Sequence, residues 1–255
     1  MTDKIRQEKS EEGILYGIGV GPGDPELMTI KALRILKECD VVFTPGKSRM
    51  ESTAYGIAVQ ALPELEEKDC VCVEIPMVHD RKQLKQAYDQ AADLVEERLC
   101  RGQKAAFLNL GDVTLYATYL HVHRRIQKRG FQAELINGIP SFCAAAAAFG
   151  TGLAEGHEQF HILAKPGQVE AGLALSGTKV IMKRSSQFRQ QLETAEQEGQ
   201  EVFLAENCGM PGQRLQRGAG AVTGQEGYYS LILVKEKKKL QENRAERNGV
   251  QTDEA

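Results

Sequence analysis

The sequence contains no tryptophan, and aromatic residues of any kind make up only 6% of its 255 residues. Proteins that bind single-stranded nucleic acid stack the bases on aromatic side chains, so a base-stacking surface is not expected here. Positive charge is not in excess either, because the formal net charge is −3 and the isoelectric point is about 6.0. The chain therefore lacks the electrostatic signature of a nucleic-acid partner.

Long apolar runs and paired cysteines are missing as well. The longest apolar candidate, FCAAAAAFGTGLA, falls short of the roughly 20 residues that a membrane-spanning helix needs. The six cysteines include no C-x-x-C pair, which argues against a structural zinc site, and a disulfide framework is not expected. The polar start MTDKIRQEKSEEG does not resemble a signal peptide. We therefore expect a cytoplasmic protein without a membrane partner.

Apolar runs typical of strands alternate with helix-like segments in the first 150 residues. The strand-like runs cover 14–20, 40–44, 71–75, 105–110 and 132–136, and the helix-like segments cover 25–38, 52–62 and 81–99. This alternation predicts an α/β domain with a largely parallel sheet. Further strand-like runs follow at 160–164, 179–183, 201–205 and 228–234, joined by loops rich in glycine and glutamine.

The change of pattern near residue 150 predicts two domains. We place an N-terminal α/β domain at 13–152 and a C-terminal α/β domain at 153–235, with the ligand site in the cleft between them. The flanking segments 1–12 and 236–255 are predicted to be disordered, because they contain too few apolar residues to form a core.

The loop Gly17–Asp24, GIGVGPGD, follows an apolar run and precedes a helix-like pattern. The dinucleotide fingerprint G-x-G-x-x-G fails, since its third glycine falls on Pro22 or on Asp24, and no Gly-Lys-Ser/Thr of a P-loop follows. Asp24 is well placed as a helix N-cap with Pro25 at the first helical position. A carboxylate there competes with a phosphate for the same N–H groups. The loop is therefore unsuited to phosphate, and a purely structural turn is an equally good interpretation.

Two further loops have the same strand–turn–helix form. Leu110–Tyr116, LGDVTLY, contains Asp112, which could cap a helix or accept hydrogen bonds from a ligand. Asn137–Phe142, NGIPSF, contains Ser141, which could cap the alanine-rich segment that follows. Ligands of parallel sheets collect where strands end. Taken one at a time, however, each loop is better explained as structural.

Five separated motifs together resemble the tetrapyrrole methylase family: GVGPGDPELMT, GDVTLY, NGIPSFCAAAA, VIMK and ENCGMPGQRL. The resemblance covers about Ile14 to Val234. Within the family, the chain resembles the branch that methylates C20 of precorrin-2 or cobalt-factor II. The segments that carry this resemblance are DVVFTPGKSRMESTA, GDVTLYATY, MKRSSQF and YYSLILV. The alternatives are a methyltransferase for another ring carbon and a non-catalytic protein that binds S-adenosylmethionine (SAM) or a tetrapyrrole.

The resemblance implies the two-domain tetrapyrrole methylase fold, with a mixed sheet flanked by helices in each α/β domain. It also implies a homodimer, SAM as methyl donor, a tetrapyrrole substrate and a role in cobalamin biosynthesis. No protein-bound metal is expected, and any cobalt would belong to the substrate. His121 and His123 are a poor chelating pair, because residues i and i+2 of a helix point to different faces. His79 could approach the substrate, although a core or surface position is the better interpretation.

The resemblance also implies site residues, which are carried over position by position. Asp112 and Tyr116 are the candidates for removing a proton. Where this chain departs from the family pattern, Val113 and Asn137 each replace a proline. Pro45 stands where related enzymes have an aspartate proton acceptor, so that role cannot be transferred. The expected SAM contacts are Pro22, Gly111, Asp112, Leu115, Pro140, Ser141, Met182, Ala205, Asn207 and Cys208.

A tetrapyrrole polycarboxylate calls for basic residues at its entrance. Lys47 and Arg49 could clamp the substrate, and so could Lys183 and Arg184, although solvated surface charge is the better explanation for any one of them. Asp24, in the first loop, is expected beside the substrate.

Overall fold

The computed structural model describes residues 13–78, 80–182 and 188–237, which fall into two compact units. The described part of the first unit comprises 13–152 and 205–215, and that of the second comprises 153–204 and 216–237. The division falls after Gly152, but 205–215 groups with the first unit rather than with the C-terminal domain to which we assigned it. The segment 1–12 and most of the predicted tail lie outside the described residues.

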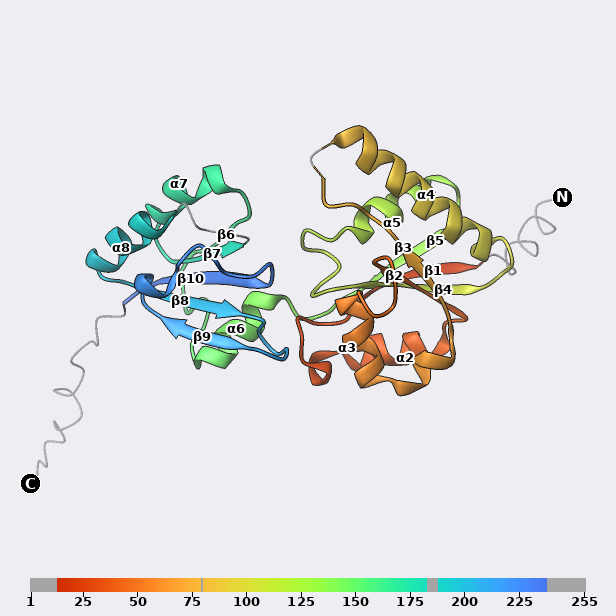
Figure 1. Cartoon of the computed structure of the whole chain (residues 1–255), viewed down its shortest axis with the longest axis horizontal. Coiled ribbons are helices and arrows are strands. Elements are labelled where there is room, and N and C mark those ends of the chain that lie inside the picture. Colours follow the sequence, from red (N-terminus) through yellow and green to blue (C-terminus); the bar gives the residue numbers. More distant parts are fainter. Residues whose placement is uncertain (1–12, 79, 183–187, 238–255) are drawn as a thin grey trace, which may run out of the picture. The chain divides into compact units, whose positions relative to one another are not determined.

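The first unit contains a five-stranded sheet in the order β3-β2-β4-β1-β5 (Figure 1). Its strands are β1 (Ile14–Gly19), β2 (Val41–Pro45), β3 (Asp69–Val73), β4 (Lys104–Asn109) and β5 (Gln132–Ile136). Every neighbouring pair is parallel, and an isolated bridge between Gly21 and Gly111 is antiparallel. The largely parallel sheet predicted from the alternation is thus confirmed, whereas the mixed sheet expected in each domain does not extend to these five strands.

Helices cover both faces of this sheet. One core packs α2 (Ile30–Glu38) and α3 (Thr53–Ala61) against the strands, and the other packs α4 (Arg81–Leu99) and α5 (Tyr119–Lys128). Burial on both faces explains why β4 reads as an apolar run, since all of its residues after Lys104 are buried. The first unit also contains the 3₁₀ helices η2 (Pro25–Leu27) and η3 (Pro63–Glu67) and the α-helix α6 (Ser141–Phe149).

The predicted cap Asp24 begins a shorter helix than expected, and the predicted cap Ser141 was wrong. Asp24 accepts a hydrogen bond from the N–H of Glu26, but it caps only the 3₁₀ turn η2. The α-helix α2 begins at Ile30, where Thr29 Oγ1 accepts from the N–H of Ala32. Ser141 is itself the first residue of α6 and follows Pro140, with no side-chain cap. Good capping residues recur along this chain, and the local pattern does not say which one is used.

The second unit has a mixed five-stranded sheet in the order β6-β7-β10-β8-β9. β6 pairs parallel with β7, and β7 pairs antiparallel with β10. Apolar residues of α7 and α8 share one hydrophobic core with this sheet. β10 includes Glu236, the first residue of the predicted tail. The elements are β6 (Phe160–Leu163), η4 (Pro166–Gln168), α7 (Val169–Leu173), β7 (Thr178–Met182), α8 (Arg189–Gln197), β8 (Gln200–Glu206), β9 (Arg214–Arg217), η5 (Ala219–Ala221) and β10 (Ser230–Glu236).

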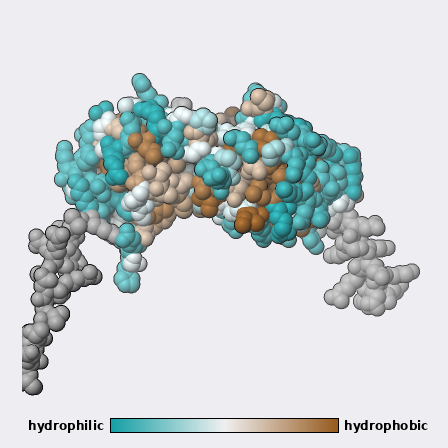
Figure 2. All heavy atoms as spheres, turned by 90° about the horizontal axis from the view of Figure 1, so that it is seen from below, coloured by the Kyte–Doolittle hydropathy of each residue, from teal (hydrophilic) through white to brown (hydrophobic). Residues whose placement is uncertain are grey.

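The described helices are all too short or too polar to cross a lipid bilayer. On the face of the first unit drawn in Figure 2, hydrophobic patches stand among hydrophilic side chains.

Gly17, in the middle of β1, makes room for the fully buried ring of Tyr119 on α5. A Cβ at Gly17 would lie 1.9 Å from Cε1 of that ring. We expect Gly17→Ala to destabilise the protein by about 1–3 kcal/mol, because neither strand nor ring can move freely. Urea unfolding checks this. The control is Gly56→Ala in α3, where a Cβ meets nothing within 4 Å and alanine favours the helix; equal stability of the two variants would contradict the account.

Candidate functional site

The three predicted ligand loops meet at the carboxyl ends of β4, β1 and β5, which are neighbours in the sheet. Gly21 and Gly111 exchange backbone hydrogen bonds of 3.3 and 2.8 Å. A Cβ at Gly138 would lie 2.2 Å from the Gly111 carbonyl oxygen and 2.9 Å from Cα of Gly19. Only glycine permits this approach, so the glycines of the three motifs serve one junction.

The carboxylate of Asp112 ties two of these loops together. Its Oδ1 accepts hydrogen bonds from the hydroxyl and the N–H of Thr114, the latter at 2.7 Å. Its Oδ2 accepts from the N–H of Gly138 at 2.9 Å and from Nδ2 of Asn137 at 3.2 Å. Asp112 therefore caps no helix. Asn137, which replaces a proline of the family pattern, donates one of the hydrogen bonds that Asp112 accepts.

Burial and hydrogen bonding act in opposite directions on Asp112. Its side chain is buried, and desolvation raises the pKa of the carboxyl group. The hydrogen bonds from Thr114, Asn137 and Gly138 outweigh desolvation, and the net effect lowers the pKa. A carboxylate that holds four hydrogen bonds and a lowered pKa is a weak proton acceptor, so the geometry argues against the catalytic role predicted for Asp112 and favours a positioning role.

The turn after β8 packs on the first loop. Gly209 has φ +76°, and a Cβ there would lie 2.7 Å from the backbone nitrogen of Asp24. A Cβ at Gly23 would lie 2.5 Å from the carbonyl oxygen of Cys208. These contacts explain why 205–215 groups with the first unit and bring the predicted residues Ala205, Asn207 and Cys208 into it.

Backbone strain coincides with the predicted site. In the part of the chain that the structure describes, two non-glycine residues have positive φ: Tyr116 at 49° and Asn207 at 48°. Asparagine tolerates this conformation, whereas for a bulky tyrosine it is uncommon and costs about 1–3 kcal/mol. Strain of this kind gathers at functional sites, and both residues were predicted to be functional.

The remaining SAM contacts predicted in the first unit lie on these loops. Pro22 is buried, whereas Leu115, Pro140 and Ser141 are half-buried. Val113, the other departure from the family pattern, is fully buried in the core. Met182 belongs to the second unit, where it ends β7 in register with Leu231.

The predicted substrate clamps have other partners. Arg49 donates hydrogen bonds to the carbonyls of Glu66 at 3.2 Å and Lys68 at 3.4 Å, and its guanidinium lies 5.7 Å from the centre of the Tyr55 ring. It therefore anchors its own loop, which argues against a clamp. Lys47 forms an exposed ion pair with Glu74 at 3.6 Å. Lys183, Arg184 and His79 lie outside the described residues.

His121 and His123 have separate partners. His121 stacks on Tyr88 with ring centres 4.3 Å apart, and Nδ1 of the buried His123 lies 3.1 Å from the hydroxyl of Tyr119. Across the described residues, no group of three or more His, Cys, Asp or Glu side chains could hold a metal ion.

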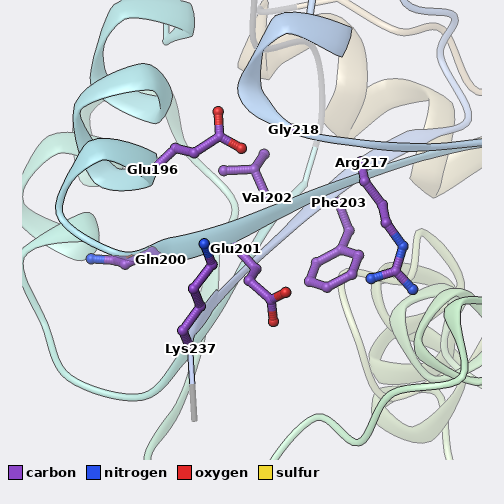
Figure 3. A pocket seen from close by; sticks show the side chains of 8 residues that line it. All are labelled: Glu196, Gln200, Glu201, Val202, Phe203, Arg217, Gly218 and Lys237. Atoms are coloured by element: carbon purple, nitrogen blue, oxygen red, sulfur yellow. The ribbon is translucent and has the colours of Figure 1, made fainter. Parts of the chain in front are cut away.

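A hollow of about 150 Å³ lies in the second unit, where Arg217 covers the Phe203 ring at 4.8 Å (Figure 3). It is smaller than the usual 300–1,000 Å³ of small-molecule sites, and none of the predicted site residues lines it. The lining residues are Glu196, Gln200, Glu201, Val202, Phe203, Arg217, Gly218 and Lys237.

Comparison with known proteins identifies relatives along most of the chain. A family model described as "Tetrapyrrole (Corrin/Porphyrin) Methylases" matches residues 14–221. A Methanocaldococcus jannaschii protein named probable cobalt-precorrin-2 C(20)-methyltransferase is 36% identical over 170 residues, which cover 66% of this chain and 71% of the relative. A Sinorhizobium protein named precorrin-2 C(20)-methyltransferase is 29% identical over 243 residues, covering 87% and 95%. The solved structure of cobalt precorrin-4 methyltransferase CbiF shares the fold, with a TM-score of 0.68 at 18% identity, over 87% of this chain and 94% of that one.

The Asp112 junction generates a prediction about pH. Folding lowers the pKa of the Asp112 carboxyl group. Its contribution to the free energy of unfolding is therefore fully present above the unfolded pKa of about 3.9, and it disappears as the pH falls through the folded pKa. We expect Asp112→Asn to lower the free energy of unfolding at pH 7 by about 1–3 kcal/mol, since an amide NH₂ cannot accept these bonds.

Thermal unfolding between pH 7 and pH 2 tests this. The difference in melting temperature between wild type and Asp112→Asn should become smaller below about pH 4. Glu97→Gln, at an exposed carboxylate on α4, should change stability by less than about 0.5 kcal/mol. A difference for Asp112→Asn that is independent of pH would contradict the assigned role.

Proposed function

The chain belongs to the tetrapyrrole methylase family, and from this premise we propose that it transfers a methyl group from SAM to C20 of precorrin-2 or cobalt-factor II in cobalamin biosynthesis. The observation that carries the proposal is the junction at which the three glycine loops meet at the ends of β4, β1 and β5. The names of the Methanocaldococcus and Sinorhizobium relatives support C20 as the position.

The chemistry of the loops fits SAM. The segments 17–24, 110–118 and 137–143 contain no lysine or arginine, whereas Asp24 and Asp112 are acidic. Such loops suit a ligand with a cationic sulfonium and an ammonium group and no phosphate. The residues that would hold SAM are Pro22, Gly111, Leu115, Pro140, Ser141, Met182, Ala205, Asn207 and Cys208.

SAM supplies an activated methyl group whose leaving group is neutral, so methyl transfer needs no general acid. The protein's contribution is then mainly alignment, which can supply roughly 7–11 kcal/mol at best. Asp112 serves this alignment by joining the loop after β4 to the loop after β5. A shift of one loop would move the other with it.

In this proposal Tyr116, as the phenolate, takes the proton from C20 and becomes the neutral phenol, while the ring keeps the electron pair of the broken C–H bond. Its side chain is 59% exposed and stands on the same loop as Asp112. The strained backbone at Tyr116 fixes where this side chain leaves the loop.

A homodimer and a cytoplasmic location complete the proposal. The family resemblance supports the homodimer. Light scattering of the purified protein measures the first, and fractionation of the source cells measures the second.

The activity is tested by anaerobic incubation with SAM and either metal-free precorrin-2 or cobalt-factor II. We expect S-adenosylhomocysteine and one added methyl, placed at C20 by NMR of labelled product. The preferred substrate distinguishes the metal-free route from the cobalt route. A methyl on another carbon would keep the family and refute the position, and SAM binding without transfer would favour a non-catalytic binding protein.

Tyr116→Phe tests the assigned proton acceptor. We expect kcat to fall by about 10²-fold or more, because general-base contributions are of that order, with SAM affinity unchanged. The matched control is Tyr228→Phe, which removes the hydroxyl of another exposed tyrosine in the second unit. Full activity of Tyr116→Phe would remove Tyr116 from the mechanism.

A further inference from the structure

The most exposed large hydrophobic side chains of the described residues gather at one edge of the first sheet. They are Met50 at 95%, Ile30 at 86%, Met77 at 82% and Tyr116 at 59% exposure. The other exposed hydrophobic side chains of the described first unit, Leu94 and Leu135, are at 41% and 36%. Single exposed hydrophobic residues need no explanation, but four at one end of a sheet form a set.

Each member of the set follows a different, adjacent strand. Met77 follows β3, Met50 follows β2, Tyr116 follows β4, and Ile30 begins the helix after β1, which matches the order β3-β2-β4-β1. All four residues lie in segments that leave the carboxyl ends of parallel strands, and the glycine junction lies at the same end of the sheet.

The loop that carries Met50 is held firmly on both sides. Arg49 is bound to the carbonyls of Glu66 and Lys68. On the other side, the buried Ser52 has its Oγ 2.5 Å from Oγ1 of Thr44, and its N–H donates to the Arg49 carbonyl at 3.2 Å. Met50 is therefore presented to solvent by an anchored turn.

The Met50 and Met77 loops are also joined to each other. The N–H of Gly46 donates to the carbonyl of Val73 at 3.0 Å, and Lys47 pairs with Glu74 at 3.6 Å. The ion pair is exposed and therefore weak, so Lys47 can exchange its partner for a ligand carboxylate. The two methionines thus stand on one connected surface with a cation beside them.

We propose that Met50 and Met77, together with Ile30, form a platform on which one flat face of the tetrapyrrole lies. The inference rests on the proposed function and deepens it by naming the residues that select a large conjugated ring. Methionine suits this task, because its flexible thioether contacts aromatic rings favourably and adapts to their shape. Lys47 would meet a carboxylate arm at the rim.

The experiment compares wild type with the double variant Met50→Gln/Met77→Gln. Anaerobic absorbance titration measures tetrapyrrole affinity, calorimetry measures SAM affinity, and the methyl-transfer assay gives kcat. We expect the tetrapyrrole Kd to rise about tenfold or more, as for the loss of about 1.4 kcal/mol, with SAM affinity unchanged. Met50→Leu/Met77→Leu should retain most of the affinity. The control is Leu94→Gln, which places an amide at an exposed leucine of α4 away from the proposed platform.

The outcomes separate this inference from the function on which it rests. A wild type that binds no tetrapyrrole overturns both. An active wild type whose glutamine variant keeps its tetrapyrrole affinity overturns the platform alone. If the glutamine double variant is a monomer in light scattering and the wild type is a dimer, Met50 and Met77 join two copies of the chain. That result would also refute the platform.

Discussion

The site depends above all on the hydrogen bonds that the Asp112 carboxylate accepts across two loops. Thr114 lies on its own loop, but Asn137 and Gly138 belong to the loop after β5, on the far side of β1. The glycines at the end of β1 let these two loops approach. A charged acceptor with several donors is worth more than a neutral hydrogen bond, and it holds two otherwise independent turns in one arrangement. The alignment that methyl transfer requires follows from this contact.

The rest of the site can be understood as a consequence of that fixed junction. The turn Asn207–Met210 packs onto the first loop through Gly23 and Gly209, which adds a segment distant in sequence to the same surface. Strain at Tyr116 and Asn207 persists because neighbouring contacts determine their backbone. The loops that carry Met50 and Met77 are held separately, by the bonds of Arg49 and Ser52 and by the bond from Gly46 to Val73.

Much of the fold could be predicted from the sequence because central strands such as β2, β4 and β7 are almost wholly buried and stand out as apolar runs. β9, Arg214–Arg217, was missed because its sequence RLQR contains one apolar residue. Asp24 was expected to begin a helix over 25–38, but it caps only η2. Thr29 is an equally good cap and lies at the actual start of α2. The role of Asp112 could not be read locally, since its partner Gly138 is 26 residues away. Likewise, Arg49 resembles a free cation in the sequence, and its carbonyl partners become visible only when η3 is in place.

The most direct test of the account measures whether the glycine junction binds SAM. Calorimetric titration would compare wild type with Gly138→Ala, whose added Cβ would lie 2.2 Å from the Gly111 oxygen, and with Gly56→Ala as the helix control. We expect one SAM per chain for wild type and for Gly56→Ala. Gly138→Ala should bind SAM at least about tenfold more weakly, a loss of about 1.4 kcal/mol. Undiminished SAM binding by a folded Gly138→Ala protein would contradict it.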